Sequence, residues 1–312
     1  MSTISPSAAP ASPALSRGRR RRSARGRLVP YAYLSPTVVV MTILLVVPIV
    51  MVISYSLMEG AVTSKHSAFV GLENYVGILT GGKFWIALKN TAIFTAASVI
   101  AHMVLGLAFS MLLNSEHVSR VTRTVFRTLF VLPWLLTVAI IAILWRLLLD
   151  PNGIVNYLLH TLGLTQGRVE WLSNPSIALA AVILINIWAG YPFFMISLLA
   201  GLQGIPRDLY EAAEVDGAGA VRVFWHITLP QLRPIIVSMA MLDLIWTSQQ
   251  FALIWMTTGG GPLNRTEMLS TFTYKLAFAQ YDFSAASASA VITLLLSMIL
   301  AIGYVRTQKA GD

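Results

Sequence analysis

The chain has 312 residues, of which 56% are hydrophobic and only 11% are charged, and its mean hydropathy is +0.72. In soluble domains about a quarter of the residues are charged. So few charged residues cannot cover a water-facing surface of this size, and the composition predicts an integral membrane protein. The absence of cysteine excludes disulfides, thiolate metal sites and cysteine nucleophiles. The net charge of +9 does not indicate a nucleic-acid partner, because seven arginines lie in one tract at residues 17–27.

Residues 1–28 are predicted to form a disordered, arginine-rich segment in the cytoplasm. Residues 2–16 are mostly Ser, Ala and Pro, which bury too little apolar area to offset the entropy of ordering. The arginine tract that follows lies next to a hydrophobic stretch. In that position it is typical of a topology signal that contacts anionic membrane lipids.

Residues 29–312 are predicted to form one transmembrane domain. A membrane-spanning helix needs about 20 mostly apolar residues, and open strands cannot cross lipid with unpaired backbone groups. The sequence therefore predicts an all-α membrane protein with six transmembrane helices. The predicted spans are residues 33–57, 85–113, 125–149, 177–202, 229–256 and 285–305.

The distribution of Lys and Arg predicts a cytoplasmic N-terminus. With that orientation, fifteen of these residues lie in inside segments and seven lie outside or at the outer ends of spans. Without the arginine tract the numbers are eight and seven, so the prediction depends mainly on that tract. An even number of spans then also places the C-terminus in the cytoplasm of a multi-pass protein of the plasma (inner) membrane.

The predicted inside loop at residues 205–230 has the signals of a short helix, a sharp turn and a second short helix. Pro206 suits the first position of a helix, and Asp208 suits the positive end of its dipole. Gly217 suits the left-handed residue that ends a helix. A second short helix is expected near residues 220–226, and Pro230 is expected to start the fifth span. On these physical grounds alone, an ordinary amphipathic connecting loop remains an equal alternative.

The same loop resembles a family motif. Permeases of binding-protein-dependent ABC importers carry a cytoplasmic sequence of the form E-A-A, three residues, G, nine residues, I, any residue, L-P. This chain matches every element at the right spacing. The resemblance implies a type I ABC importer permease (MetI-like) fold and a coupling helix that docks on an ATPase. The implied docking residues are Glu211, Ala212, Ala213, Asp216, Gly217, Ile227, Leu229 and Pro230.

The resemblance covers nearly the whole chain after residue 28 and is closest to the sugar-transport branch, with similarity to maltose and glycerol-phosphate permeases. Looser matching segments lie at residues 69–75, 127–134 and 258–278. The implied partners are a second permease subunit, two ATP-binding subunits, an extracytoplasmic solute-binding protein and a sugar. No cofactor is expected on this chain. It has no phosphate-binding loop, so ATP and Mg²⁺ are expected on the partner ATPase, and the permease is not an enzyme.

Two helix faces are candidates for the solute pathway. The fourth predicted span carries Asn186, Gly190 and Phe193 at i, i+4 and i+7, and the fifth carries Asp243, Thr247 and Gln250 at the same spacing. Polar groups inside a span usually face the bundle or a water-filled cavity, and amides and carboxylates suit sugar hydroxyls. The resemblance implies that these two helices supply most of the sugar site, with Phe193 replacing another aromatic residue. Helix packing through the same residues is the alternative.

Two ionisable residues inside spans have different expectations. Asp243 is expected to have a function or a tight polar pairing, because a lone buried acid is costly. His102, in the second span, has no second ligand at helical spacing, so packing or a hydrogen bond is expected rather than a metal site. No metal site is predicted anywhere.

Three other functions compete with a sugar ABC permease. An ABC permease for a non-sugar solute would share every feature above. A self-sufficient secondary transporter would need intramembrane ionisable pairs and an internal repeat. A membrane enzyme would need acids or histidines clustered near one interface, and the sequence has none.

Overall fold

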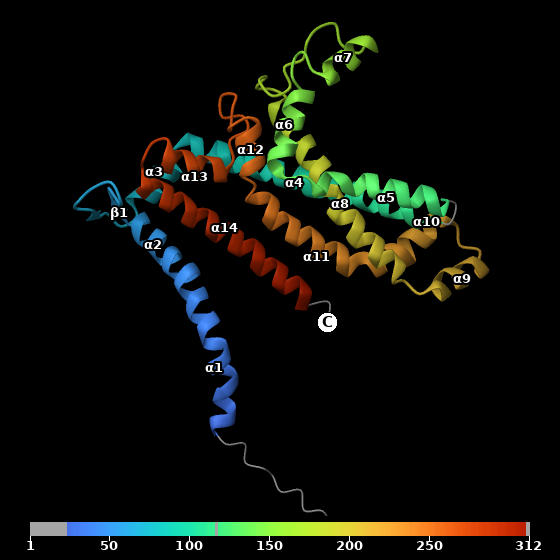
Figure 1. The fold of residues 1–312 in the computed structure, drawn as a ribbon, viewed down its shortest axis with the longest axis horizontal. Helices are drawn as coiled ribbons and strands as arrows, with labels where there is room; N and C mark the ends of the chain where they lie inside the picture. The colour runs from blue at the N-terminus through green and yellow to red at the C-terminus, as the bar shows by residue number, and fades with distance from the viewer. Residues whose placement is uncertain (1–23, 116–117, 310–312) are drawn as a thin grey trace, which may run out of the picture. The chain divides into compact units, whose positions relative to one another are not determined.

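The computed structural model describes residues 24–115 and 118–309. It divides into two compact units, with the boundary between Met51 and Val52, and each unit is described by itself. The helices and short strands of the described residues appear along the chain in Figure 1.

The first unit is helical. It contains α1 (Ala24–Met41), the π-helix η1 (Thr42–Val46) and the start of α2 (Val47–Ser56). The segment Tyr33–Ser56 is long and apolar enough to span a membrane, as predicted for residues 33–57. The predicted disordered segment lies outside the described residues up to residue 23. Residues 24–28 belong to α1.

Two π-helices each end two residues before a proline. The helix η1 precedes Pro48, and η2 (Phe224–Thr228) precedes Pro230. Proline lacks an N–H and its ring clashes with the carbonyl four residues earlier. The wider π turn accommodates that ring, so the helix continues through it.

The predicted start of the fifth span at Pro230 is therefore wrong. A helix of 29 residues runs without a break from Ala220 to Ser248 through α10 (Ala220–Val223), η2 and α11 (Leu229–Ser248). It also ends earlier than predicted. Residues 249–251 leave the helix, and α12 (Ala252–Thr257) follows as a separate short helix.

The prediction of one continuous helix over residues 125–149 is also wrong. The structure has α5 (Arg120–Leu135) and α6 (Val138–Leu148), whose axes are bent by 101°. Pro133 weakens the last turn of α5 by removing a hydrogen bond. Thr137 then starts the new helix, because its hydroxyl accepts a hydrogen bond from the Ile140 N–H at 3.4 Å.

The other predicted spans are confirmed as single helices. They are α4 (Gly82–Asn114), α8 (Ala178–Gln203) and α14 (Phe283–Lys309). Among the described residues, five helices are long and apolar enough to cross a membrane, and the bent pair α5 and α6 makes a sixth if it counts as one span. In the part of the chain that the structure describes, the regular elements are helices apart from one small pair of strands.

The centre of the second unit is the pair α4 and α8, which pack along each other. Gly106 of α4 allows this approach, because a Cβ atom there would lie 2.4 Å from Cβ of Phe194. The helix α11 packs against α4, α8 and α14, as Figure 1 shows for α11 and α14.

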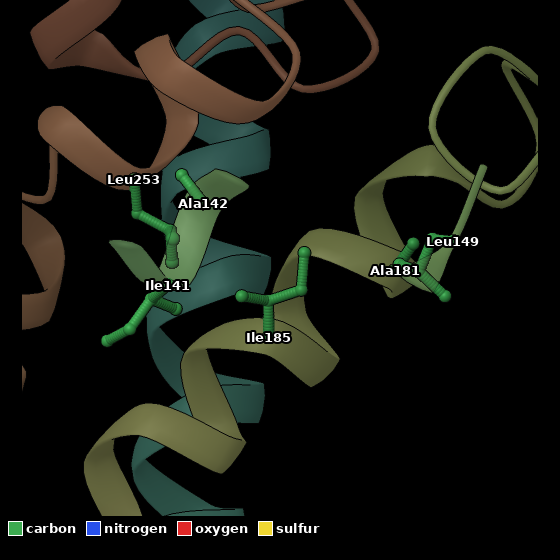
Figure 2. Packing of buried hydrophobic residues seen from close by; sticks show 6 residues of the cluster. All are labelled: Ile141, Ala142, Leu149, Ala181, Ile185 and Leu253. Carbon is green, nitrogen blue, oxygen red and sulfur yellow. The ribbon is translucent and has the colours of Figure 1, made fainter. Parts of the chain in front are cut away.

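A second packing centre holds the bent segment in place. Side chains from α6, α8 and α12 form the apolar cluster in Figure 2, with Ile141, Ile185 and Leu253 each at most 4% exposed. In a membrane protein, such side chains hold helices together by van der Waals packing. The cluster therefore fixes α6 against α8 despite the sharp bend before it.

Short elements connect the long helices. They are the antiparallel strands β1 (Met58–Glu59) and β2 (Ala68–Phe69), and the helices α3 (Glu73–Thr80), α7 (Ile154–Thr161), α9 (Arg207–Val215) and α13 (Leu269–Phe278). The loop before α13 is tied to α4, because the Asn90 amide donates to the backbone carbonyls of Asn264 and Glu267 at 3.0 and 3.1 Å. Glu267 also pairs with Lys275.

We expect Gly106→Ala to destabilise the protein by about 1–3 kcal/mol, because the added methyl group overpacks the contact of α4 with α8. The matched control is Gly303→Ala in α14, where a Cβ would meet only the end of Met241 at 3.9 Å. Thermal unfolding in detergent measures both. Equal melting temperatures for the two variants would contradict the close approach.

Candidate functional site

A cavity of about 290 Å³ opens between α4, α8, α11 and the junction of α5 with α6. All six residues predicted for the solute pathway line this cavity: Asn186, Gly190, Phe193, Asp243, Thr247 and Gln250. The remaining lining residues are His102, Pro133, Trp134, Leu136, Val138, Ile141, Ala189 and Trp246. The structure thus brings together residues that the sequence placed on two separate helix faces.

The His102 side chain connects three helices at the wall of this cavity. From α4, its Nδ1 atom lies 2.8 Å from Oδ2 of Asp243 on α11, and its Nε2 atom lies 3.0 Å from the backbone oxygen of Asn186 on α8. The ring is 1% exposed. Asp243 also accepts a hydrogen bond at Oδ1 from the Thr247 hydroxyl, at 2.9 Å.

The hydrogen-bond partners fix the charge of this pair. A backbone carbonyl only accepts, so Nε2 of His102 carries a proton. The contact of Nδ1 with Oδ2 at 2.8 Å then needs one more proton between the two atoms. Whether that proton resides on the ring or on the carboxyl group, the sum of the charges is zero.

The ring of His102 fits because residue 190 is glycine. A Cβ atom at Gly190 would lie 2.4 Å from both Cε1 and Nε2 of the imidazole. Any larger residue on α8 would therefore displace the ring from its two partners. Gly190 has a packing role here that its predicted place in the solute pathway did not include.

The Asn186 side chain has a donor left over. The residue is 5% exposed, and its Nδ2 atom has no hydrogen-bond partner among the described residues. A buried amide donor without a partner costs about 1–3 kcal/mol. A solute hydroxyl in the cavity that Asn186 lines would satisfy it.

Aromatic rings form one side of the cavity. The Phe193 ring lies with its centroid 5.6 Å from that of Trp246 and 6.4 Å from that of Trp134. Two other aromatic residues of α8 have partners outside this cavity. Tyr191 donates to the Phe130 carbonyl at 3.1 Å, and Trp188 packs edge-on against Trp145.

The two predictions for ionisable residues in spans are confirmed. His102 makes hydrogen bonds, and Asp243 has a tight polar pairing. The sequence analysis did not connect the two residues, which lie 141 positions apart. The signal was present, because one basic and one acidic side chain in the middle of two spans each need a partner.

The predicted coupling loop has the expected shape. The helix α9 begins after Pro206 and ends at Val215, with Asp216 as its C-cap, and Gly217 has a φ of +71°. The N–H groups of Gly217 and Ala218 bond to the carbonyls of Glu214 and Ala213 at 3.0 and 2.9 Å. This pair of bonds is a Schellman motif, which satisfies the last carbonyls of the helix.

The described residues place the predicted docking residues in different environments. Ala213 is buried, and Ile227 and Leu229 are partly buried. The exposed members are Glu211, Ala212, Asp216, Gly217 and Pro230. The loop is anchored to the helix that follows it by the Tyr210 hydroxyl, which lies 3.2 Å from the Thr228 hydroxyl.

Residues 102–309 match the family described as "Binding-protein-dependent transport system inner membrane component". The match covers both the cavity and the coupling loop. The chain belongs to this family. It is therefore a multi-pass permease component of a transport system of that kind.

Named relatives agree with this membership. A probable ABC transporter permease protein of Sinorhizobium fredii is 38% identical, with 91% of this chain and 90% of the relative covered. The trehalose/maltose transport system permease protein of Thermococcus litoralis is 34% identical over 89% and 93% of the two chains. A chain in the crystal structure of a bacterial ABC transporter that imports the acidic polysaccharide alginate is 25% identical, with a TM-score of 0.79 over 92% of this chain and 96% of the other.

We expect Asp243→Ala to destabilise the protein by about 3–5 kcal/mol, because it removes one partner of a buried pair. Asp243→Asn should cost far less, since its amide can donate to Nδ1 of His102 and its oxygen can accept from Thr247. Thermal unfolding of the purified protein compares the two variants. A small loss for the alanine variant would mean that the pair contributes little.

Proposed function

We propose that this chain is the permease subunit of an ATP-driven sugar importer and that the cavity beside His102 is its solute site. The observation that carries the proposal is the convergence of Asn186, Asp243, Thr247 and Gln250 on one cavity with Phe193 and Trp246. Amide, hydroxyl and carboxyl groups supply donors and acceptors for sugar hydroxyls, and aromatic rings supply apolar faces for the ring of a sugar. The carbohydrates in the names of two similar proteins support the same class.

The chain itself performs no catalysis in this proposal. Its sequence has no phosphate-binding loop, so ATP and Mg²⁺ bind to separate ATPase subunits. The other partners are a second permease and an extracytoplasmic solute-binding protein that delivers the sugar. Both termini lie in the cytoplasm, which puts α9 on the side of the ATPase.

The coupling loop is proposed to dock on the ATPase through the exposed residues of α9 and its turn. A mechanical connection from there to the cavity is present within the chain. Tyr210 contacts Thr228 in η2, and the continuous helix Ala220–Ser248 carries Asp243 and Thr247 at its far end. A displacement of the loop is thereby transmitted to the cavity wall, which supports alternating access driven by ATP.

A second candidate function is a secondary transporter that uses proton movement. The specific observation in its favour is the buried pair of His102 with Asp243, since intramembrane ionisable pairs are typical of proton relays. Membership of a binding-protein-dependent family favours the ATP-driven function instead. The two differ in their energy source.

The experiment is reconstitution of the chain in proteoliposomes with the second permease, the ATPase and the binding protein of its importer. ATP is enclosed in the lumen, and labelled trehalose, maltose or an alginate tetrasaccharide is added outside. We expect uptake of a carbohydrate that needs ATP and the binding protein and that persists when an ionophore removes the proton gradient. Uptake by the chain alone that stops with the ionophore would establish the second candidate.

We expect Asn186→Ala to raise the sugar concentration for half-maximal uptake roughly ten-fold, because the loss of one hydrogen bond to a solute costs about 1–2 kcal/mol. The maximal rate and the assembly of the importer should change little. Uptake titrations measure both. Unchanged half-saturation with the same selectivity would place the solute elsewhere.

We expect Gly217→Val to lower ATP-driven uptake roughly 5–30-fold, because a side chain in the left-handed region costs about 1–2 kcal/mol and depopulates the turn. No atom lies within 4 Å of a Cβ built at Gly217, so crowding within the subunit does not contribute. The matched variant Gly217→Asn should keep most of the activity, because Asn tolerates this conformation. An equal loss of uptake in both variants would mean that the presence of a side chain, rather than the left-handed backbone conformation, causes the loss.

A further inference from the structure

The charge of the cavity depends on one side chain. Among the residues that line it, only His102 and Asp243 are ionisable. The lining residues from α5, α6 and α8 are uncharged, and Tyr191 of α8 points away from the cavity to the Phe130 carbonyl. Asp243 would therefore present a carboxylate to the cavity if His102 did not pair with it.

We propose that His102 is a positioning residue that keeps the cavity electrically neutral, so that this subunit accepts an uncharged sugar rather than an acidic or a cationic one. This inference rests on the proposed function for the site and for the sugar class. The named similar proteins do not decide it, because one is named for trehalose and maltose and another for the import of an acidic polysaccharide.

The geometry supports neutrality in three ways. The Asn186 carbonyl holds a proton on Nε2 of His102, and the short contact to Asp243 holds one further proton for the pair. Gly190 leaves the notch in which the ring lies. Thr247 donates to the second carboxyl oxygen, which leaves little of Asp243 to face a solute, since it is 8% exposed.

The wall that remains has the character of a site for a neutral polyhydroxylated ligand. The Asn186 Nδ2 atom is a free donor among the described residues, and Gln250 adds an amide. A solute carboxylate would find no unpaired cationic side chain among the lining residues to offset its lost hydration. A solute ammonium group would find no unpaired carboxylate, so both kinds of charged sugar are disfavoured.

The test measures the potential in the cavity without any need to know the sugar. The chain has no cysteine, so Gln250→Cys introduces one reporter thiol in the cavity wall. In the assembled importer in nanodiscs, the thiol reacts with either a cationic trimethylammonioethyl or an anionic sulfonatoethyl methanethiosulfonate. The intact mass of this chain gives each rate, and the ratio of the two rates is normalised to that for free mercaptoethanol.

The reporter is combined with three backgrounds. His102→Gln should raise the ratio of cationic to anionic rates about ten-fold or more, because it leaves the Asp243 carboxylate without a counter-charge. Asp243→Asn should leave the ratio within about two-fold of the parent, since the partners stay neutral. The double variant His102→Gln with Asp243→Asn should return to the parent ratio.

The outcomes separate charge from packing. A ratio that stays high in the double variant, or that does not change in His102→Gln, would overturn the proposal, because a purely structural role of the ring predicts no rescue. A thiol that reacts with neither reagent in any background would also overturn it, since the cavity would then be closed to solute.

Uptake measurements with the sugars of the reconstitution experiment provide an independent test. The importer should take up trehalose or maltose and not the acidic alginate tetrasaccharide, and uptake of the alginate probe alone would overturn the proposal. If no carbohydrate is taken up, the proposed sugar function fails, while the ratio of reagent rates still decides whether His102 sets the charge.

Discussion

The contact of the His102 ring with Asp243 and the Asn186 carbonyl is the interaction on which the centre of the protein depends. It joins α4, α8 and α11 through His102, which is 1% exposed. An unpaired acid at this depth costs several kcal/mol. The pair removes that cost, and the same contact determines the charge of the cavity wall.

Glycine makes this contact possible. A glycine on each of α4 and α8 makes room for a side chain of the other helix. The imidazole enters the space at Gly190 from one side, and Phe194 enters the space at Gly106 from the other. In membranes, small residues at helix interfaces allow close backbone approach, and this packing replaces the hydrophobic driving force of water. The rigid pair of α4 and α8 can therefore support a cavity on its flank.

The fold and the site were predictable from the sequence to different degrees. The coupling turn was predictable in detail, because Gly217 after a capped amphipathic stretch has few other structures available. The cavity residues on α8 and α11 were predictable from the helical spacing that starts at Asn186 and Asp243. Gln250 also lines the cavity, but it lies beyond the end of α11, so helical spacing does not explain its position. The link between His102 and Asp243 was predictable only as the need of each residue for a partner. Helical periodicity describes one helix at a time and carries no information about which helices meet.

The continuous helix from Ala220 to Ser248 explains a further error of the sequence analysis. Proline was interpreted as the start of a span, which is its commonest role near helix ends. The π turn at η2 changes that outcome, because it makes room for the ring of Pro230 without ending the helix. Under the proposed function this continuity is important, since a break there would disconnect the coupling loop from Asp243.

The two interruptions that sequence hydropathy could not detect both lie at the cavity. One separates α5 from α6 next to Leu136 and Val138, and the other follows α11 at Gln250, and all three residues line the cavity. Irregular backbone at membrane depth is tolerated only where it is buried in protein or borders a water-filled space. Hydropathy averaged over a whole span does not detect such breaks, even though Ser248, Gln249 and Gln250 beside the second one are polar. The positions of the two breaks therefore support a hydrated pathway at the cavity. This support comes from the backbone and is independent of the side chains of α8 and α11.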